Sequence, residues 1–523
     1  MLLLSSRKDL QAVLGRYATN TLKHINMVKS FSSRISSWIL GRGMEIEMML
    51  DIKERAKKEK FAALEEELAE VLKTTLNGLM ELNDFLDGLE KLAFTSLHVF
   101  RENNNMLHLP PGISLDLVQD IITAAQQTCP LRLMFMLDTD DFFVPQLQNL
   151  EVLLIQLNKY MIISQLMCDK MEKSSFSDWR PPRSTETNVE LPVDLSEDDI
   201  QEMLTHIKQL HSIRLNQNFR IAFMFQDDLS STFLQEFDER RDRMLEFLDK
   251  LDESTGQMDR MHKGARISSI AGSSVGAVGG VMSIVGLALS PVTAGLSLGL
   301  TIAGISLGVT SGVNSIVTTL TELGVNKREK NKASKTLEDF MKDAGVLYEC
   351  LEKVGTKGTT LEEFAEAIAK VAVELDSLKK TADDLRNLLI QFLLLECSIM
   401  KRASKLVSDI PDIGQAAARG AAGFARAARV GFIALNALFV GIDVFFIVKD
   451  GLSLAKGSKS ELVKFFTARA ALWRSQMTSW EKIYESQKEG QERMKIHLAA
   501  LDTPFYPGRR SEEESRSLLD PNH

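Results

Sequence analysis

The chain is poor in several residue types and patterns on which common protein classes depend. Its 4 cysteines in 523 residues are far apart and form no CxxC pair, so a disulfide-stapled fold is excluded and buried free thiols are expected. Its 12 prolines are few, and almost no segment alternates with period 2. The net charge of −9 gives no support for nucleic-acid binding. Helical periodicity dominates and predicts an all-α fold.

The sequence also lacks a catalytic constellation, and we expect neither enzymatic activity nor a cofactor. His206 and His211 are five residues apart, a spacing that does not place both on one helix face for a metal. The run GSKS at 457–460 lacks the spacing and the preceding strand of a phosphate-binding loop. The opening run MLLLSSRKDL has too few apolar residues for a signal peptide, so we expect an intracellular protein.

The sequence also contains one long stretch without any charged residue. Residues 267–321 carry no formal charge, although 25% of the chain is charged. Pro291 divides this stretch into two apolar arms, which predicts a helical hairpin in need of a bilayer or a large protein core. Basic residues flank this hairpin and precede a later apolar segment, where we expect contacts with anionic lipid: Lys263, Arg266, Lys327, Arg328, Lys330, Arg426 and Arg429.

Glycines recur every four residues within the hairpin, which places them on one helix face and allows two backbones to approach closely. Glycine inside a water-exposed helix costs roughly 1 kcal/mol, so the repeat predicts tight helix–helix packing. The predicted packing residues are Gly272, Gly276, Gly280, Pro291, Gly295, Gly299, Gly304, Gly308 and Gly312. The alternative is a helical bundle that buries the hairpin; both hold if the bundle shelters the hairpin in water and releases it at a membrane.

A second apolar segment, residues 430–448, contains Asp443 as its single charge. Its length just reaches that of a bilayer-spanning helix. A protonated carboxyl enters hydrocarbon at much lower cost than an ionised one, which predicts a pH-sensing or pore-lining role for Asp443. The alternative is an aspartate on the surface of a helix.

Breaks in the helical pattern divide the chain into eight parts. They are an N-terminal helical region (1–172), a Pro-rich linker (173–195), amphipathic helices with heptad-like spacing (196–265), the uncharged hairpin (266–322), amphipathic helices (323–410), a small-residue and apolar helix (411–450), a C-terminal amphipathic helix (451–504) and a disordered tail (505–523). Within them we expect helices over 52–72, 115–127, 147–171, 337–354, 361–407 and 459–501, and an N-cap at Ser196.

Three segments resemble the apolipoprotein L family. The run GLALSPVTAGLSLGLTIAGISLGVTSGVNSIVTTL is similar to the family's membrane-addressing region, residues 237–264 to the helix before it, and GIDVFFIVKDGLSLAKGSKSEL to a later apolar segment and turn. The resemblance covers residues 230–489 and leaves 1–229 uncovered. It implies lipid binding, association with membranes or lipoprotein particles and, in some members, ion-conducting pores. Ala294 stands where members often carry Glu, which argues against acid sensing at this turn.

Three functional hypotheses follow. The first is a lipid-binding protein that associates with or inserts into membranes, with a role in lipid transport implied by the resemblance. The second is a pH-dependent ion channel, and the third is a soluble coiled-coil scaffold. The expected partners are lipids, anionic ones included, with self-association or a helical protein partner as further alternatives. We expect a membrane-associated location inside the cell, the alternative being an extracellular, lipoprotein-associated protein as for secreted members.

Overall fold

The computed structural model describes residues 2–56, 61–101, 106–135, 144–225, 228–255, 339–340, 343–347, 350–351, 353–355, 357–376, 378 and 459–506. These residues are almost entirely helical, and their only sheet pairs two short strands. The prediction of an all-α fold is confirmed.

The first half of the described chain forms one group of helices. Its elements are α1 (Leu2–Ser32), α2 (Ile35–Arg55), α3 (Phe61–Ala93), α4 (Ser96–Val99), α5 (Leu115–Thr128), η1 (Cys129–Phe135), η2 (Leu147–Asn149), α7 (Leu150–Glu172) and η3 (Ser175–Asp178). Helix α3 packs on α1, α2 and α5, and α7 packs on α2 and α5. The short strands β1 (Leu107–His108) and β2 (Asn188–Val189) pair antiparallel beside α1.

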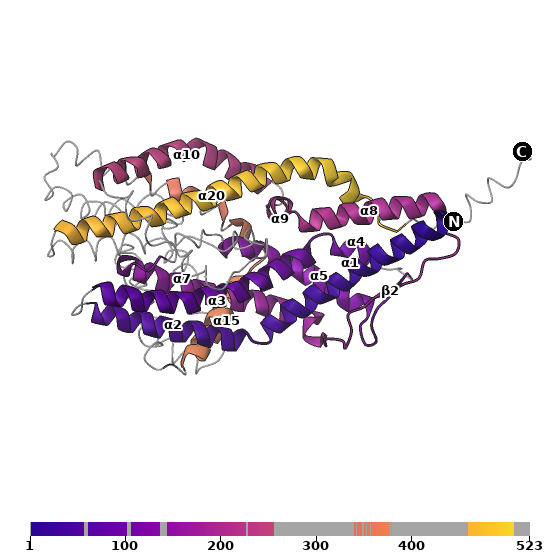
Figure 1. The fold of residues 1–523 in the computed structure, drawn as a ribbon, viewed down its shortest axis with the longest axis horizontal. Helices are drawn as coiled ribbons and strands as arrows, with labels where there is room; N and C mark the ends of the chain where they lie inside the picture. Colours follow the sequence, from indigo (N-terminus) through magenta and orange to yellow (C-terminus); the bar gives the residue numbers. More distant parts are fainter. Residues whose placement is uncertain are drawn as a thin grey trace, which may run out of the picture.

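The second group contains α8 (Glu197–Leu215), α9 (Gln217–Met224), α10 (Asp228–Thr255) and the long α20 (Lys459–Asp502). Helix α20 packs on α9 and α10, and α8 packs on α1 of the first group. Figure 1 shows α10 and α20 side by side along one long edge of an elongated molecule, with α2, α3 and α7 on the opposite side. Helix α15 (Leu361–Asp376) comes late in the sequence but lies with α2 and α7.

Local chemistry explains where several helices begin. Ser196 accepts a hydrogen bond from the backbone N–H of Asp199, and Asp199 accepts one from the N–H of Ser196. This capping box satisfies two N–H groups that the first turn leaves without partners, and confirms the predicted N-cap. The expected helix over 115–127 is confirmed as α5, where Ser114 caps the N–H of Leu117.

One helix predicted from the sequence differs from the structure. The single helix expected over 52–72 is wrong, because α2 ends at Arg55 and α3 begins at Phe61, and the two helices pack together. The Pro-rich linker over 173–195 is mostly exposed, but Phe176, Trp179 and Thr187 within it are buried. Trp179 within it is fully buried and donates from Nε1 to Asn26 of α1 at 2.8 Å. Burying the large apolar indole ring is favourable, and it holds this part of the segment against α1 even though the flanking sequence is typical of a loop.

One hydrophobic core runs through both groups of helices. Its largest aromatic side chains include Phe85 of α3, Phe94 directly after that helix, Tyr160 of α7 and Trp480 of α20. The three described cysteines, Cys129, Cys168 and Cys350, are buried free thiols, as predicted. Burial raises the pKa of the Cys129 and Cys168 thiols to about 12, so both are protonated and unreactive near neutral pH.

Candidate functional site

Every residue predicted from sequence to pack the hairpin, to sense pH or to contact lipid lies outside the described residues. This holds for the glycines between 272 and 312, for Pro291, for Asp443 and for the seven flanking basic residues. The structure does describe the helices on either side of those segments. Helix α10 precedes the hairpin, and α15 and α20 follow it.

Helix α10 is anchored on α20 by an apolar seam and by ion pairs. Phe237, Met244 and Leu248, three apolar positions of the predicted heptad-like spacing, are buried as core residues, and Leu234 is half-buried. Arg241, in the same seam, pairs with Glu481 of α20. The Glu481 hydrogen bond and charge raise the pKa of Arg241 above its ordinary value, so this guanidinium is charged at all physiological pH.

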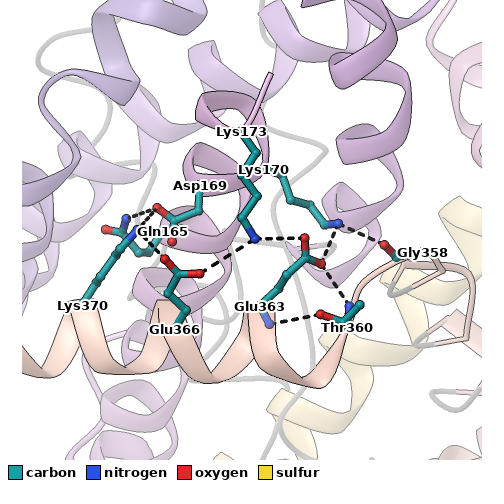
Figure 2. A network of polar contacts seen from close by, with 9 residues as sticks. All are labelled: Gln165, Asp169, Lys170, Lys173, Gly358, Thr360, Glu363, Glu366 and Lys370. Atoms are coloured by element: carbon teal, nitrogen blue, oxygen red, sulfur yellow. Dashed lines mark hydrogen bonds and ion pairs between the residues drawn. The ribbon is translucent and has the colours of Figure 1, made fainter. Parts of the chain in front are cut away.

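Helix α15 is held on the end of α7 by alternating charges, which we call the α7–α15 clasp (Figure 2). Lys170 and Lys173 donate to the Glu363 carboxylate at 3.0 and 3.2 Å, and Lys173 also lies 3.8 Å from Glu366. One turn along, Lys370 reaches back to Asp169 at 2.7 Å. The clasp therefore consists of Asp169 and Lys170 on α7, of Lys173 at its C-cap, and of Glu363, Glu366 and Lys370 on α15.

Glu363 has two roles, because it also caps its own helix. Its carboxylate accepts a hydrogen bond from the Thr360 N–H at 3.0 Å, and its N–H donates to Thr360 Oγ1 at 3.2 Å. This is a capping box at the start of α15. Partial burial raises the pKa of Glu363, but the hydrogen bonds from Thr360 and Lys170 outweigh it, and the pKa lies below its ordinary value. The group is therefore ionised at neutral pH.

The apolar face of α15 completes its contact with the first group of helices. Ala367, Val371 and Leu375 are buried at four-residue spacing, and Ile368 packs beside them. Gly43 of α2 lies directly under this face: a Cβ atom there would overlap Leu375 and come within 2.8 Å of Leu378. The missing side chain at Gly43 thus lets α15 approach α2 closely.

A second ionic cluster joins α3 to α8 and α9 inside the molecule. Glu90 is buried and pairs with both Arg132 of η1 and Arg220 of α9. Arg220 also donates to Asp87 and to the Arg214 carbonyl. Burial lowers the pKa of Arg132 to about 9, which still leaves the guanidinium charged at neutral pH.

Arg214 extends this cluster towards α1. Its Nη2 donates to Thr21 and to Ser96 at 2.8 and 2.9 Å, and its guanidinium stacks on the Tyr17 ring at 4.4 Å. Ser96 follows Thr95, which adopts a left-handed conformation with φ of 57° and shares a hydrogen bond with the Tyr17 hydroxyl. The buried charges are thus all held by polar partners, as burial requires.

Within the described ranges, no group of three or more His, Cys, Asp or Glu side chains could hold a metal ion. Also within those ranges, no helix has both the length and the apolar character to cross a membrane. His206 packs against Phe505 and His98, while His211 lies against Tyr17, so the two histidines of α8 have separate surroundings.

Sequence reasoning missed the clasp, although part of it was readable. Thr360 and Glu363 match the Ser/Thr-x-x-Glu signature of a capping box, directly before an apolar periodic run. Their partners Lys170 and Lys173 are about 190 residues away in the sequence. No local pattern predicts a pairing across that separation.

Comparison with known proteins identifies the family. The profile described as Apolipoprotein L matches residues 188–471. Human apolipoprotein L3 is 27% identical over 258 residues, which cover 48% of this chain and 60% of the relative. Human apolipoprotein L6 is 24% identical over 255 residues, which cover 49% of this chain and 73% of the relative.

A shorter match, to human apolipoprotein L5, is 39% identical over 103 residues, which are 20% of this chain and 24% of the relative. The chain thus spans less than two thirds of the length of apolipoprotein L3. No solved structure matches it. Because the profile match extends over more than half of the 523 residues, this protein is a member of the apolipoprotein L family.

Proposed function

We propose that this protein binds lipid surfaces and that residues 267–321 insert into them. The observation that carries the proposal is the position of the uncharged stretch inside the family match at 188–471. An apolar run of this length needs a hydrocarbon or protein environment. The relatives are named apolipoproteins, a name that refers to lipid association.

The charge distribution supports binding to anionic membranes. Lys263 and Arg266 precede the uncharged stretch, and Lys327, Arg328 and Lys330 follow it. Basic residues beside an apolar segment contribute about 1 kcal/mol each near an anionic surface. The protein in this proposal acts by association rather than catalysis, at membranes inside the cell.

Flotation of the full chain with lipid vesicles tests the proposal. We expect the protein to float with phosphatidylcholine vesicles and to float more completely when phosphatidylserine is included. Replacing Lys327, Arg328 and Lys330 with Glu should remove the gain from phosphatidylserine, whereas Lys482→Glu on α20 should not. A wild-type protein that stays at the bottom of the gradient with both vesicle types would contradict lipid binding.

Carbonate extraction separates insertion from surface binding. A protein whose uncharged stretch enters the bilayer stays with the membrane at high pH, because hydrophobic burial does not depend on the charges that carbonate disrupts. Complete release into the supernatant would contradict insertion while leaving surface binding intact.

A further inference from the structure

Helix α15 belongs to the family-matched segment, but it docks on helices outside that segment. The match begins at residue 188, after α2 and α7, and these are the two helices on which α15 mainly packs. Of the other long helices that begin in the matched segment, α8 packs on α1, whereas α10 packs on α20, most of which lies beyond the match. We call residues 1–187 the N-terminal region. Its contact with α15 is a surface between two parts of the chain.

The contact between α15 and the N-terminal region is weak enough for α15 to separate from α2 and α7. Three of the six side chains in the α7–α15 clasp are about half exposed: Lys173 at 49%, Lys370 at 45% and Glu366 at 50%. Ion pairs at that exposure are screened by solvent and contribute little individually. The apolar contact is narrow, since it rests on Ala367, Val371, Leu375 and the partly buried Ile368.

The composition of α15 indicates what it binds when it leaves α7. An amphipathic helix with an apolar face can lie in a lipid–water interface. Helix α15 has 16 residues, and a helix of that length is marginally stable alone in water. The helix carries five acidic residues and one lysine. Anionic headgroups repel such a helix, so a neutral, zwitterionic lipid surface fits it better.

We propose that α15 is a detachable lipid-binding helix, that the α7–α15 clasp holds it in the lipid-free protein, and that a zwitterionic lipid surface takes the place of α2 and α7. This proposal rests on the lipid binding proposed above and adds which helix is released and what restrains it. The N-terminal region then acts as an internal partner that covers the apolar face of α15 in water.

Charge reversal on α7 tests the clasp without touching α15. In the variant Lys170→Glu with Lys173→Glu, both replacements face Glu363, and the capping box of Thr360 and Glu363 remains. We expect amide hydrogen exchange within 361–376 to become about tenfold faster, because the ion pairs become repulsions. Exchange in α5 should not change. The variant should also float more completely than the wild type with phosphatidylcholine vesicles.

Two further variants serve as controls. Lys73→Glu with Lys495→Glu makes the same change in net charge at two exposed ion pairs on α3 and α20. Its exchange and flotation should match the wild type. Lys370→Glu should accelerate exchange in α15 because Lys370 pairs with both Asp169 and Glu366. The added Asp169→Lys should slow exchange again in part, because it re-forms the pair between the helices with reversed signs while Glu366 still faces the carboxylate introduced at position 370.

Each outcome is decisive. Unchanged exchange in 361–376 after reversal of Lys170 and Lys173 would overturn the clasp. Faster exchange without greater flotation, in a protein whose wild type floats, would overturn α15 as the lipid-binding helix and leave the proposed function standing. If neither protein floats with any vesicle, lipid binding itself is overturned and the lipid part of this inference with it, whatever the exchange result.

Discussion

Arg220 of α9 donates through Nε to Glu90 of α3 at 2.7 Å, and both side chains are buried. The pair joins a residue of the family-matched segment to one of the N-terminal region, 130 residues earlier. Glu90 also neutralises Arg132, so one carboxylate serves two guanidinium groups. Such a carboxylate is hard to replace, because its loss removes a counter-charge from two buried guanidinium groups, of which Arg220 keeps Asp87.

Glu90→Gln should therefore destabilise the protein by about 3–5 kcal/mol, the cost of removing one partner from a buried ion pair. The measurement is urea unfolding followed by circular dichroism. The matched control is Glu81→Gln on the same helix, whose pair with Arg34 is exposed and long at 3.8 Å. This control should change stability by less than about 0.5 kcal/mol. Equal effects of the two substitutions would show that the buried ion pairs of Glu90 contribute no more to stability than an exposed pair does.

The N-terminal region should stay bound to the rest of the chain after the connection between them is cut. A specific protease site placed at Arg183 and Ser184, both exposed, permits a single cut. The pieces are held by the Glu90 cluster, by the strand pair and by Arg7, which donates to the Leu191 carbonyl at 3.0 Å. We expect co-elution in size-exclusion chromatography at neutral pH.

The same cut in the Glu90→Gln background supplies the comparison. Those pieces should separate at a lower urea concentration than the pieces with Glu90 intact, because the central ion pairs between them are lost. Pieces that separate without denaturant even with Glu90 present would contradict a stable interface between the two parts.

The sequence predicted helices well and their partners poorly. The C-terminal helix expected over 459–501 is found at Lys459–Asp502, because its amphipathic pattern continues without a break. The N-cap at Ser196 was readable from a serine before three acidic residues. Both are local properties, set by neighbours within one or two turns.

Which helices pack together depends on residues far apart in the sequence, so the sequence pattern did not predict it. Periodicity shows that α15 has an apolar face, but α2 covers it only because Gly43 leaves room for Leu375. Trp179 lies in a segment rich in Pro and Ser that is typical of a linker, yet it is buried against α1. In both cases the decisive contact joins residues more than 150 positions apart, which no spacing rule encodes.

Acid should weaken the interface between α1, α4 and α8. Burial, reinforced by the charges of Arg214 and Lys91, lowers the pKa of His24 to about 3. Burial, with Arg101 and His206, lowers the pKa of His98 to about 4. An unfolded histidine titrates near 6.5, so below that pH the unfolded state binds protons that the folded state does not. The stabilisation is complete above pH 6.5 and is lost as the pH falls towards 3–4.

For His24 alone, the slope approaches about 1.4 kcal/mol per pH unit between roughly pH 6 and 4. His24→Leu should flatten the dependence of unfolding free energy on pH in that window. His108→Leu is the matched control, because His108 is half exposed and pairs at the surface with Glu190. Indistinguishable pH profiles for wild type and His24→Leu would contradict a buried neutral His24.

The contact between α20 and α9 should tolerate no side chain at Gly490. A Cβ atom there would overlap the Asn218 carbonyl oxygen and lie 2.6 Å from Ala222 Cβ. The obstacle is largely backbone, which cannot rotate away, so Gly490→Ala should cost about 1–3 kcal/mol even though alanine favours helix. Gly41→Ala on α2 is the control, because nothing lies within 4 Å of its Cβ position. There the better helix propensity should stabilise the protein by about 0.5–1 kcal/mol.

Urea unfolding measures the change in stability of both variants, and amide exchange in α9 shows where Gly490→Ala acts. Stabilisation by Gly490→Ala would show that α9 and α20 are farther apart in solution than in the structure.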